Sequence, residues 1–250
     1  MAAIAGGGPG GGEVPGTASG MGAGAHGRIE TFGALVERAR DLTGGAHRVL
    51  LGITGAPGAG KTTLALALVR ALGAGRPAGW VVHVPMDGYH LADAELDRLG
   101  RRDRKGAPDT FDAAGYAALL RRLRSDPGPG PVYAPAFDRE IEQPVAGSVP
   151  VPPECRLVVS EGNYLLIDTP EWRAVRAEFD EVWFHETDDE LRRERLVARH
   201  VRFGKTPDLA RAWVQRTDEP NARLVATTRS RADVVVAGPD HAVVLPGGPA

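Results

Sequence analysis

A glycine-rich segment that ends in lysine and threonine carries the clearest chemical signal in the chain. Gly55 to Thr62 fits the pattern G-x-x-x-x-G-K-S/T, in which backbone N–H groups surround the phosphates of a nucleoside triphosphate. Lys61 can reach the β- and γ-phosphates from this loop, and the Thr62 hydroxyl can bind Mg²⁺. The predicted nucleotide-binding residues are Gly55, Ala56, Pro57, Gly58, Ala59, Gly60, Lys61, Thr62 and Thr63.

Two acidic residues each follow an apolar run and each precede a glycine. Asp87 comes after residues 80–86, and Glu161 comes after residues 156–160. Asp87 would stand where a base accepts a proton from a hydroxyl that attacks the γ-phosphoryl group, although Asp-Gly pairs are also common in turns. Glu161 would stand where an acid orients Mg²⁺ or its waters, with an exposed loop acid as the alternative.

Arginines are concentrated in one predicted helix, residues 188–202. Arg195, Arg199 and Arg202 lie at i, i+4 and i+7 and therefore share a face, whereas Arg193 points to the opposite side. That stripe could clamp phosphate as charge develops during transfer. It could equally be a solvated face whose charges pair with glutamates of the same helix, which is the usual role of a charged run.

The elements that must position these residues alternate along the chain. We expect helices at 29–42, 64–72, 109–123, 172–179, 188–202 and 208–217, and strands at 49–53, 80–86, 132–137, 156–160, 181–185, 232–236 and 242–245. Prolines within 140–151 favour an edge hairpin or a lid-like excursion. The alternation predicts an α/β fold with a parallel sheet, whose strand carboxyl ends carry ligands. Three of those ends bear the glycine loop, Asp87 and Glu161.

The composition is that of an ordinary soluble globular protein, with 42% hydrophobic and 25% charged residues. A net charge of −2 gives no basic field for a nucleic-acid partner, and no apolar run approaches the roughly 20 residues of a membrane helix. The single cysteine, Cys155, excludes an intrachain disulfide and is expected to be buried. Glycine-rich residues 1–27 predict a disordered tail without the features of a secretory signal, so a cytoplasmic protein with one domain at 28–250 is expected.

An ordered set of motifs resembles the phosphoribulokinase, uridine kinase and type I pantothenate kinase family. The set comprises 55–63, Met86-Asp87-Gly88-Tyr89-His90, Glu161-Gly162-Asn163-Tyr164-Leu165-Leu166 and the final strand 230–236. Segments 105–112 and 134–139 are similar to the substrate-side segments of that family. The likeness covers nearly everything from about residue 30 onward, and it looks closest to the bacterial nucleoside/nucleotide kinase branch related to pantothenate kinase.

The resemblance implies a P-loop NTPase fold, a three-layer αβα sandwich with a mostly parallel sheet and an arginine-rich helical lid. It implies that Asp87 is the base, that Thr62 and Glu161 serve the metal, and that the region of Arg199 and Arg202 is a mobile lid. With Lys61, these arginines and Asp87 form the expected catalytic set. The expected substrate-binding residues are Tyr89, His90, Lys105, Asp138, Arg139 and Tyr164.

The expected activity is transfer of the γ-phosphoryl group of ATP, with Mg²⁺, to a hydroxyl of a small metabolite that is pantothenate-like, a sugar or a nucleoside. The segment after Asp87 reads Gly-Tyr-His-Leu, which departs from the Ser/Asp-Phe-Tyr pattern of uridine kinases. Two alternatives stay open: a nucleoside monophosphate kinase and a nucleotide-binding regulator without turnover. The two strand-end acids favour an alcohol acceptor, because a phosphate acceptor needs no base, and no Asn-Lys-x-Asp guanine motif is present. The sequence leaves open a homodimer.

Overall fold

The structure is a computed structural model that describes residues 27–125 and 128–237. Its centre is a six-stranded sheet, parallel throughout, in the order β1-β8-β7-β2-β6-β3. The strands are Gly27–Ile29 (β1), Val49–Thr54 (β2), Val81–Pro85 (β3), Leu157–Glu161 (β6), Glu181–His185 (β7) and Val234–Val236 (β8). Because β2 lies between β7 and β6, the glycine loop that follows it starts near the middle of the sheet. The parallel sheet confirms the predicted α/β fold.

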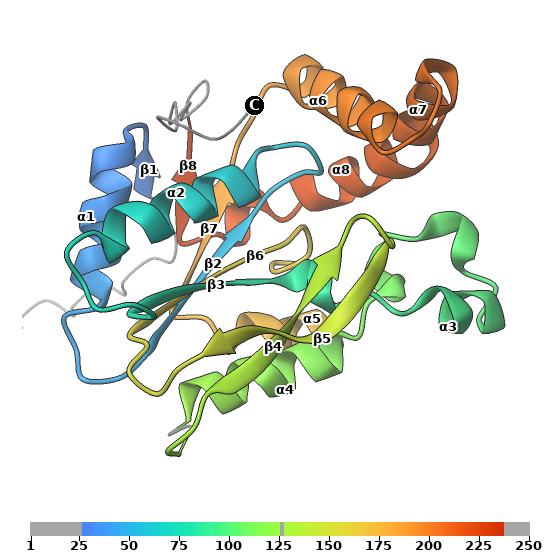
Figure 1. The fold of residues 1–250 in the computed structure, drawn as a ribbon. Helices are drawn as coiled ribbons and strands as arrows, with labels where there is room; N and C mark the ends of the chain where they lie inside the picture. Colours follow the sequence, from blue (N-terminus) through green and yellow to red (C-terminus); the bar gives the residue numbers. More distant parts are fainter. Residues whose placement is uncertain (1–26, 126–127, 238–250) are drawn as a thin grey trace, which may run out of the picture.

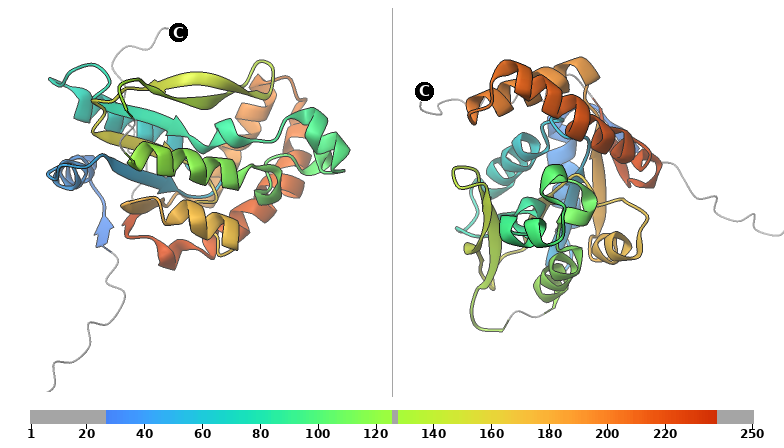
Figure 2. Two further views of the ribbon diagram at one scale, coloured as in Figure 1. Left: turned by 90° about the horizontal axis from the view of Figure 1, so that it is seen from below. Right: turned by 90° about the vertical axis from the view of Figure 1, so that its right-hand side faces the viewer.

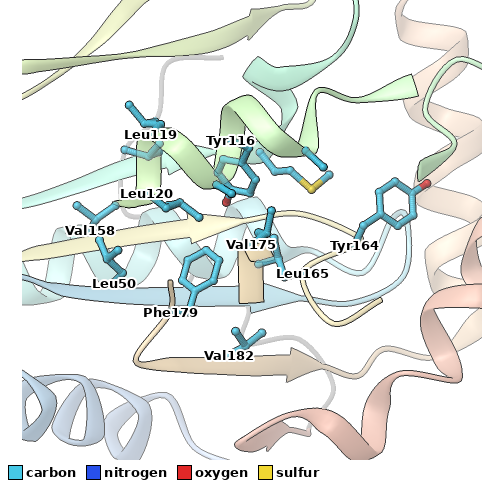
Figure 3. Packing of buried hydrophobic residues seen from close by; sticks show 14 of the residues in the cluster. Leu50, Tyr116, Leu119, Leu120, Val158, Tyr164, Leu165, Val175, Phe179 and Val182 are labelled. Carbon is cyan, nitrogen blue, oxygen red and sulfur yellow. The ribbon is translucent and has the colours of Figure 1, made fainter. Parts of the chain in front are cut away.

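Helices cover both faces of the sheet and complete the three predicted layers (Figure 1). Helices α1 (Phe32–Leu42) and α2 (Lys61–Gly73) lie on one face, and α4 (Ala113–Arg124) and α5 (Pro170–Arg176) lie on the other. Neighbouring apolar residues of β2 face opposite sides, as the pleat of a strand requires. Leu51 packs with α1 and α2, whereas Leu50 packs with Tyr116 and Leu120 of α4 (Figure 3).

A further group of helices lies beyond the carboxyl ends of the strands (Figure 1). It contains α6 (Asp189–Arg202), α7 (Pro207–Trp213), a π-helical turn (Val214–Asp218) and α8 (Glu219–Ala226). The Asp188 side chain caps α6 by accepting hydrogen bonds from the backbone N–H groups of its first turn. Gly204 ends α6 with a φ of 97°, and Thr206 caps α7. The arginine-rich helix and the break that follows it are therefore where the sequence predicted them.

The proline-containing segment forms a hairpin that is separate from the main sheet. Strands β4 (Val132–Asp138) and β5 (Gln143–Val151) pair antiparallel and lie beside β3 and the 3₁₀ turn Met86–Tyr89 (Figure 2). Residues 140–151 therefore contribute one strand of a hairpin, which one alternative predicted in part, but the hairpin is a separate two-stranded sheet and not an edge of the main one. Between that turn and α4, the chain makes an excursion through α3 (Asp93–Arg98) and two 3₁₀ turns, Arg102–Arg104 and Pro108–Thr110. A last 3₁₀ turn, Arg229–Arg231, precedes β8.

The first predicted helix begins later than expected, since Ile29 belongs to β1 and α1 starts at Phe32. The Thr31 side chain accepts a hydrogen bond from the backbone N–H of Ala34 and so fixes that start. Cys155 is free and buried, as predicted. Apart from Gly27, the predicted tail and the strand at 242–245 lie outside the described residues. None of the helices within 27–125 and 128–237 is long and apolar enough to cross a membrane.

Candidate active site

The loop between β2 and α2 has a backbone that requires glycine. Gly58 has a φ of 80°, and a Cβ atom on it would lie 2.6 Å from the carbonyl oxygen of Arg192 in α6. Gly60 has a φ of 93° and is the N-cap of α2. The loop therefore ends at a helix N-terminus, where unpaired N–H groups and the helix dipole favour an anion. A triphosphate fits this loop.

Lys61, the first residue of α2, has a buried side chain that is held at two points. Its Nζ donates hydrogen bonds to Oδ1 of Asn163 at 2.7 Å and to the carbonyl oxygen of Ala56 at 3.0 Å. Burial lowers the pKa of Lys61 to about 8, although the carboxylates of Glu161 and Asp87 oppose this shift. At neutral pH the amine is still mostly protonated and can bind phosphate oxygens.

Strand register brings Glu161 next to the glycine loop. Glu161 is opposite Ile53 of β2 on one side and Pro85 of β3 on the other. Its Oε1 accepts a hydrogen bond from the Thr62 hydroxyl at 2.9 Å. Burial, and then the charge of Asp87, raise the pKa of Glu161, so a bound cation would stabilise the carboxylate. Hydroxyl and carboxylate oxygens suit Mg²⁺, which takes its other ligands from phosphates and water.

The glycine after each strand-end acid allows close packing rather than a turn with positive φ. A Cβ on Gly162 would overlap the Met86 side chain, and a Cβ on Gly88 would overlap the carbonyl of Pro135 in the hairpin. The ends of β6 and β3 and the hairpin can therefore approach one another. Asp87 lies in the 3₁₀ turn after β3, with its Oδ2 3.3 Å from Nη2 of Arg139.

One cavity of about 530 Å³ connects these groups. The glycine loop and Glu161 form one end of its lining, and the excursion after β3, the hairpin and the helices from α6 onward form the rest. The predicted site residues that line it are Pro57, Gly58, Lys61, Thr62, Asp87, His90, Lys105, Arg139, Glu161 and Arg199. The strand-end acids, the phosphate loop and part of the predicted substrate side therefore face a single space.

Comparisons with known proteins agree with this geometry. A protein of Schizosaccharomyces pombe named "Putative uridine kinase C227.14" is 32% identical over 214 residues, which cover 83% of this chain and 91% of that protein. "ATP-dependent kinase-like protein notR'" of Aspergillus versicolor is 38% identical over 161 residues, covering 61% of this chain and 94% of that protein. The chain belongs to the P-loop kinases of the phosphoribulokinase/uridine kinase family. No family model matches the chain.

A solved structure resembles this kinase over nearly the same region. The crystal structure of a "putative fructose transport system kinase" from Silicibacter sp. TM1040 has a TM-score of 0.75 and 38% sequence identity. It covers 84% of this chain and 100% of the other. The P-loop αβα fold implied by the sequence motifs is thereby confirmed.

Two predicted substrate-binding tyrosines of the kinase do not line the cavity. The ring of Tyr89 packs against Tyr116 of α4, with centroids 5.0 Å apart. Tyr164 is fully buried among aromatic and aliphatic residues (Figure 3), and its hydroxyl donates to the carbonyl oxygen of Gly106. Tyr164 thereby anchors the excursion that carries Lys105 to the region of the cavity.

Two other predicted residues of the kinase also lie away from the cavity lining. Asp138 is exposed, and its Oδ1 accepts hydrogen bonds from the backbone N–H groups of Glu140 and Ile141 at 2.8 and 3.3 Å. It therefore stabilises the turn of the β4–β5 hairpin. Arg202 is exposed at the end of α6, with its guanidinium 6.0 Å from the centre of the Phe203 ring.

The arginines nearer the middle of α6 contact the phosphate side of the kinase site. Arg199 lines the cavity, and burial followed by the charge of Arg139 lowers its pKa. Nη1 of Arg195 lies 3.6 Å from the position that a Cβ on Gly60 would occupy. Sequence reasoning placed Arg195 on the same face as Arg199 but did not include it among the site residues. On the opposite side, Arg193 lies within ion-pair distance of acidic residues of α6 and α8.

Sequence reasoning also missed polar residues that the tertiary fold brings to the kinase cavity. Asn163 lies in the motif 161–166, in which the sequence predicted roles for Glu161 and Tyr164 but none for Asn163. His200 and Asp218 line the cavity together, with Nε2 of His200 2.9 Å from Oδ2 of Asp218. They belong to different helices, so no local sequence pattern could pair them.

A second cavity of about 660 Å³ lies on the other side of the kinase's glycine loop. Ala56 and Ala59 of the loop contribute to its walls, together with Phe184, Leu191 and Ala222. Residues of the glycine loop therefore line two cavities: the first contains Asp87, and the second has apolar residues beside the loop together with charged residues such as Asp188 and Arg223.

Proposed function

We propose that this kinase transfers the γ-phosphoryl group of ATP to a hydroxyl of a small molecule, with Mg²⁺ as cofactor. The observation that carries the proposal is that Lys61, Thr62, Glu161 and Asp87 line one cavity, whose lining also includes residues of the hairpin and of the excursion after β3. The first three residues match what a Mg²⁺-bound triphosphate requires. Asp87 adds a proton acceptor on the side where an attacking hydroxyl would enter.

In this mechanism the acceptor oxygen forms a bond to the γ-phosphorus while the bond from that phosphorus to the bridging oxygen of ADP breaks. Asp87 accepts the hydroxyl proton, and Arg139 orients the carboxylate from 3.3 Å. Lys61 stabilises negative charge on the β- and γ-phosphate oxygens, and Arg199 stabilises charge on the transferred group. Mg²⁺, when bound at Thr62 and Glu161, neutralises part of the phosphate charge.

The nucleoside of ATP would bind in the second cavity. Its apolar walls, including Phe184 and Leu191, suit a planar base. Because Ala56 and Ala59 of the glycine loop belong to the same walls, a nucleotide with its base there could extend its phosphates along the loop towards Lys61. Such a binding mode leaves the space beyond Asp87 for the acceptor.

A nucleoside monophosphate acceptor is less favourable because its attacking phosphate oxygen would approach the carboxylate of Asp87. A regulator without turnover would not need a proton acceptor at that place. The relatives' names point to different acceptors, uridine in one and fructose transport in another, so they do not select one. The cavity supports an alcohol acceptor over both alternatives.

The test is ADP formation from ATP and Mg²⁺ with and without candidate alcohols: pantothenate, uridine, cytidine, fructose and glycerate. We expect at least one alcohol to accelerate ADP release and to yield an equal amount of phosphorylated product. If ATP binds but every alcohol leaves ADP release at its basal rate, and a nucleoside monophosphate accelerates it, the alternative phosphate acceptor is correct.

A further inference from the structure

Part of the kinase cavity is lined by residues of the excursion after β3, the hairpin and the turn between α6 and α7, and we call this part the acceptor side. It contains cationic side chains that the triphosphate does not need. Arg102 and Lys105 reach it from the excursion after β3, Arg139 from the hairpin, and Lys205 from the turn between α6 and α7. They come from separate elements and line one space. Lys61 and Arg199 are already assigned to the phosphates of ATP, and Arg139 is assigned to Asp87, so the remaining positive charge of this group needs a further explanation.

One of these four cations, Lys105, is largely buried and has too few counter-charges. Nζ of Lys105 lies 2.6 Å from Oδ1 of Asp93, and Arg102 pairs with the same oxygen. The side chain of Lys105 is only 14% exposed, and Asp93 is not part of the cavity lining. Two cations thus share one carboxylate. The pKa of Lys105 is lowered, first by burial and then by the charge of Arg102.

Other pairings leave positive charge on the same side. Arg139 pairs with Asp87, yet its own charge still contributes to the lowered pKa values of Arg199 and His90. Lys205 forms no ion pair within the described residues, and its Nζ lies 4.9 Å from the centre of the Trp213 ring.

Besides Asp87 and Glu161, three further carboxylates line the cavity, and they neutralise these cations only in part: the charge of Glu142 opposes the lowering of the pKa of Lys105. Asp218 pairs with His200 at 2.9 Å. Asp103 and Glu142 are exposed to solvent, where water and salt screen their charge far more than that of a buried ammonium. The partly buried positive charge at Lys105 is therefore the stronger electrostatic feature of this side.

The backbone of the hairpin turn helps to fix Lys105. Glu142 has a φ of 53°, in the left-handed region that non-glycine residues rarely adopt, and its carbonyl oxygen accepts a hydrogen bond from Lys105 at 2.5 Å. Strained backbone of this kind persists where the surrounding structure determines it, and it is common at ligand clamps. The turn thus holds the ammonium group at the cavity instead of releasing it to solvent.

An aromatic wall lies beside the same cations. The ring of Phe137 has Nζ of Lys105 at 5.3 Å and Cζ of Arg139 at 5.8 Å from its centre. His90 packs against Phe137 and Phe111, with ring centres 4.7 and 4.0 Å away. A short carbon skeleton could contact this wall, with a hydroxyl at Asp87 and an anionic group at the cations.

We propose that the acceptor alcohol carries a carboxylate or phosphate group that binds Lys105 and Arg139 while its hydroxyl faces Asp87. The inference rests on the proposed kinase function and specifies its substrate class as small hydroxy acids or sugar phosphates. A neutral nucleoside or sugar would leave Lys105 and Arg102 to share the single carboxylate of Asp93, with no further anion for the partly buried charge of Lys105 from the acceptor. Anionic oxygens would instead form charge-assisted hydrogen bonds with both cations.

The experiment compares matched acceptors that differ in charge. The full-length protein is incubated with ATP, Mg²⁺ and four pairs: glycerate with glycerol, pantothenate with pantothenol, ribose 5-phosphate with ribose, and fructose 6-phosphate with fructose. Mass spectrometry identifies products that have gained one phosphoryl group, and coupled ADP detection gives kcat/KM. We expect the anionic member of the best pair to exceed its neutral partner by about tenfold or more. The preferred pair shows whether the group is a carboxylate or a phosphate.

Two substitutions test whether Lys105 and Arg139 cause the preference for an anionic acceptor, and a third substitution is the control. Lys105→Met and Arg139→Met should each raise KM for the anionic acceptor about tenfold and leave ADP affinity unchanged, which also shows that the fold is intact. Arg104→Met is the matched control, because Arg104 lies in the same turn, pairs with Asp109 at 2.6 Å and does not line the cavity. It should behave as wild type.

Phosphorylation confined to neutral compounds would leave the kinase function intact and refute the anionic acceptor. An anionic product formed equally well by the wild type, Lys105→Met and Arg139→Met would also refute it, because the cations would then have no part in binding. Absence of any phosphorylated product would refute the proposed function and this inference together.

Discussion

The ammonium group of Lys61 lies 2.7 Å from the side-chain oxygen of Asn163, a contact that joins the start of α2 to the segment after β6. A buried amine without acceptors would be strongly unfavourable. Within the described residues, this one donates hydrogen bonds to Asn163 and to the carbonyl of Ala56. Asn163 thus positions the phosphate-binding lysine beside Thr62 and Glu161. Three predictions concern this lysine and its contact.

The affinity for Mg-ATP should depend on pH through Lys61. Its lowered pKa of about 8 means that the charge is lost as pH rises through about 8, while phosphates bind the charged form. We expect constant affinity near pH 7 and a fall of up to about tenfold per pH unit above pH 8, measured by calorimetry. Lys61→Arg stays charged and should remove the slope. An equal slope in both proteins would exclude Lys61 as its origin.

In the protein without nucleotide, Lys61 should make the folded state more stable as pH rises, which is opposite to its effect on Mg-ATP affinity. The folded state favours the neutral amine, so the unfolded chain binds more protons between about pH 8 and pH 10.4. The contribution of Lys61 to the free energy of unfolding therefore rises with pH across that window. Lys61→Met should remove this rise in urea unfolding measured at several pH values, and a rise that persists in this variant would point to another group.

Asn163→Leu should shift the pH dependence of nucleotide binding. The substitution removes an acceptor from the Lys61 ammonium and leaves its burial similar, so the charged form is disfavoured further. We expect weaker Mg-ATP binding at pH 7.5 and a midpoint displaced to lower pH, by about one unit if one charge-assisted hydrogen bond is lost. A purely structural role would weaken binding without moving the midpoint.

Two arginines of α6 should differ in their effect on turnover. Arg199→Lys keeps the charge but loses the planar fork that grips two oxygens, so we expect kcat/KM to fall about tenfold or more, a cost of about 1.4 kcal/mol. Arg202→Lys should stay close to wild type because Arg202 is exposed and does not line the cavity. Arg193→Lys, which lies on the opposite side, is the control. An equal loss in Arg202→Lys would show that the lid closes further during turnover.

Arg48 should matter for stability and not for the site. Its guanidinium is buried and donates to the backbone carbonyls of Leu123, Cys155 and residues 152–153, so it links α4 to the segment before β6. Arg48→Met removes the guanidinium donor from all of those carbonyls, although that of Pro152 keeps a second partner, the backbone N–H of Cys155. We expect the free energy of unfolding in urea to fall by about 3 kcal/mol. Nucleotide affinity should not change. Arg122→Met, on the exposed face of α4, should cost less than about 0.5 kcal/mol.

The sequence was enough to predict that Asp87 and Glu161 lie at the same edge of the sheet. Each acid follows an apolar run, and in a parallel sheet all such ends lie at one edge. The glycine loop follows a third strand and therefore meets them there. Sequence patterns do not give strand register, and the structure shows that Glu161 lies opposite both Ile53 and Pro85.

Side chains that depend on packing between distant elements could not be assigned in this way. Tyr89 and Tyr164 lie within motifs of the family, yet the lengths and positions of α4 and α5 decide that the ring of Tyr164 is buried in the core and that the partly buried ring of Tyr89 packs against it. The carboxylate of Asp138 accepts a hydrogen bond from the backbone of its own turn, and this local role competes with substrate binding. The contact between His200 and Asp218 depends on how α6 packs against the π-helical turn Val214–Asp218.

The central claim is that Asp87 is the base of an alcohol kinase, and Asp87→Asn tests it most directly. The substitution keeps the size of the side chain and removes its ability to accept the hydroxyl proton. With an acceptor from the ADP-release screen, we expect kcat to fall by roughly 10² or more, while Mg-ATP affinity, which depends on Lys61, Thr62 and Glu161, stays within about twofold of wild type. A variant that retains its kcat, or that loses nucleotide affinity in proportion to its activity, would contradict this account.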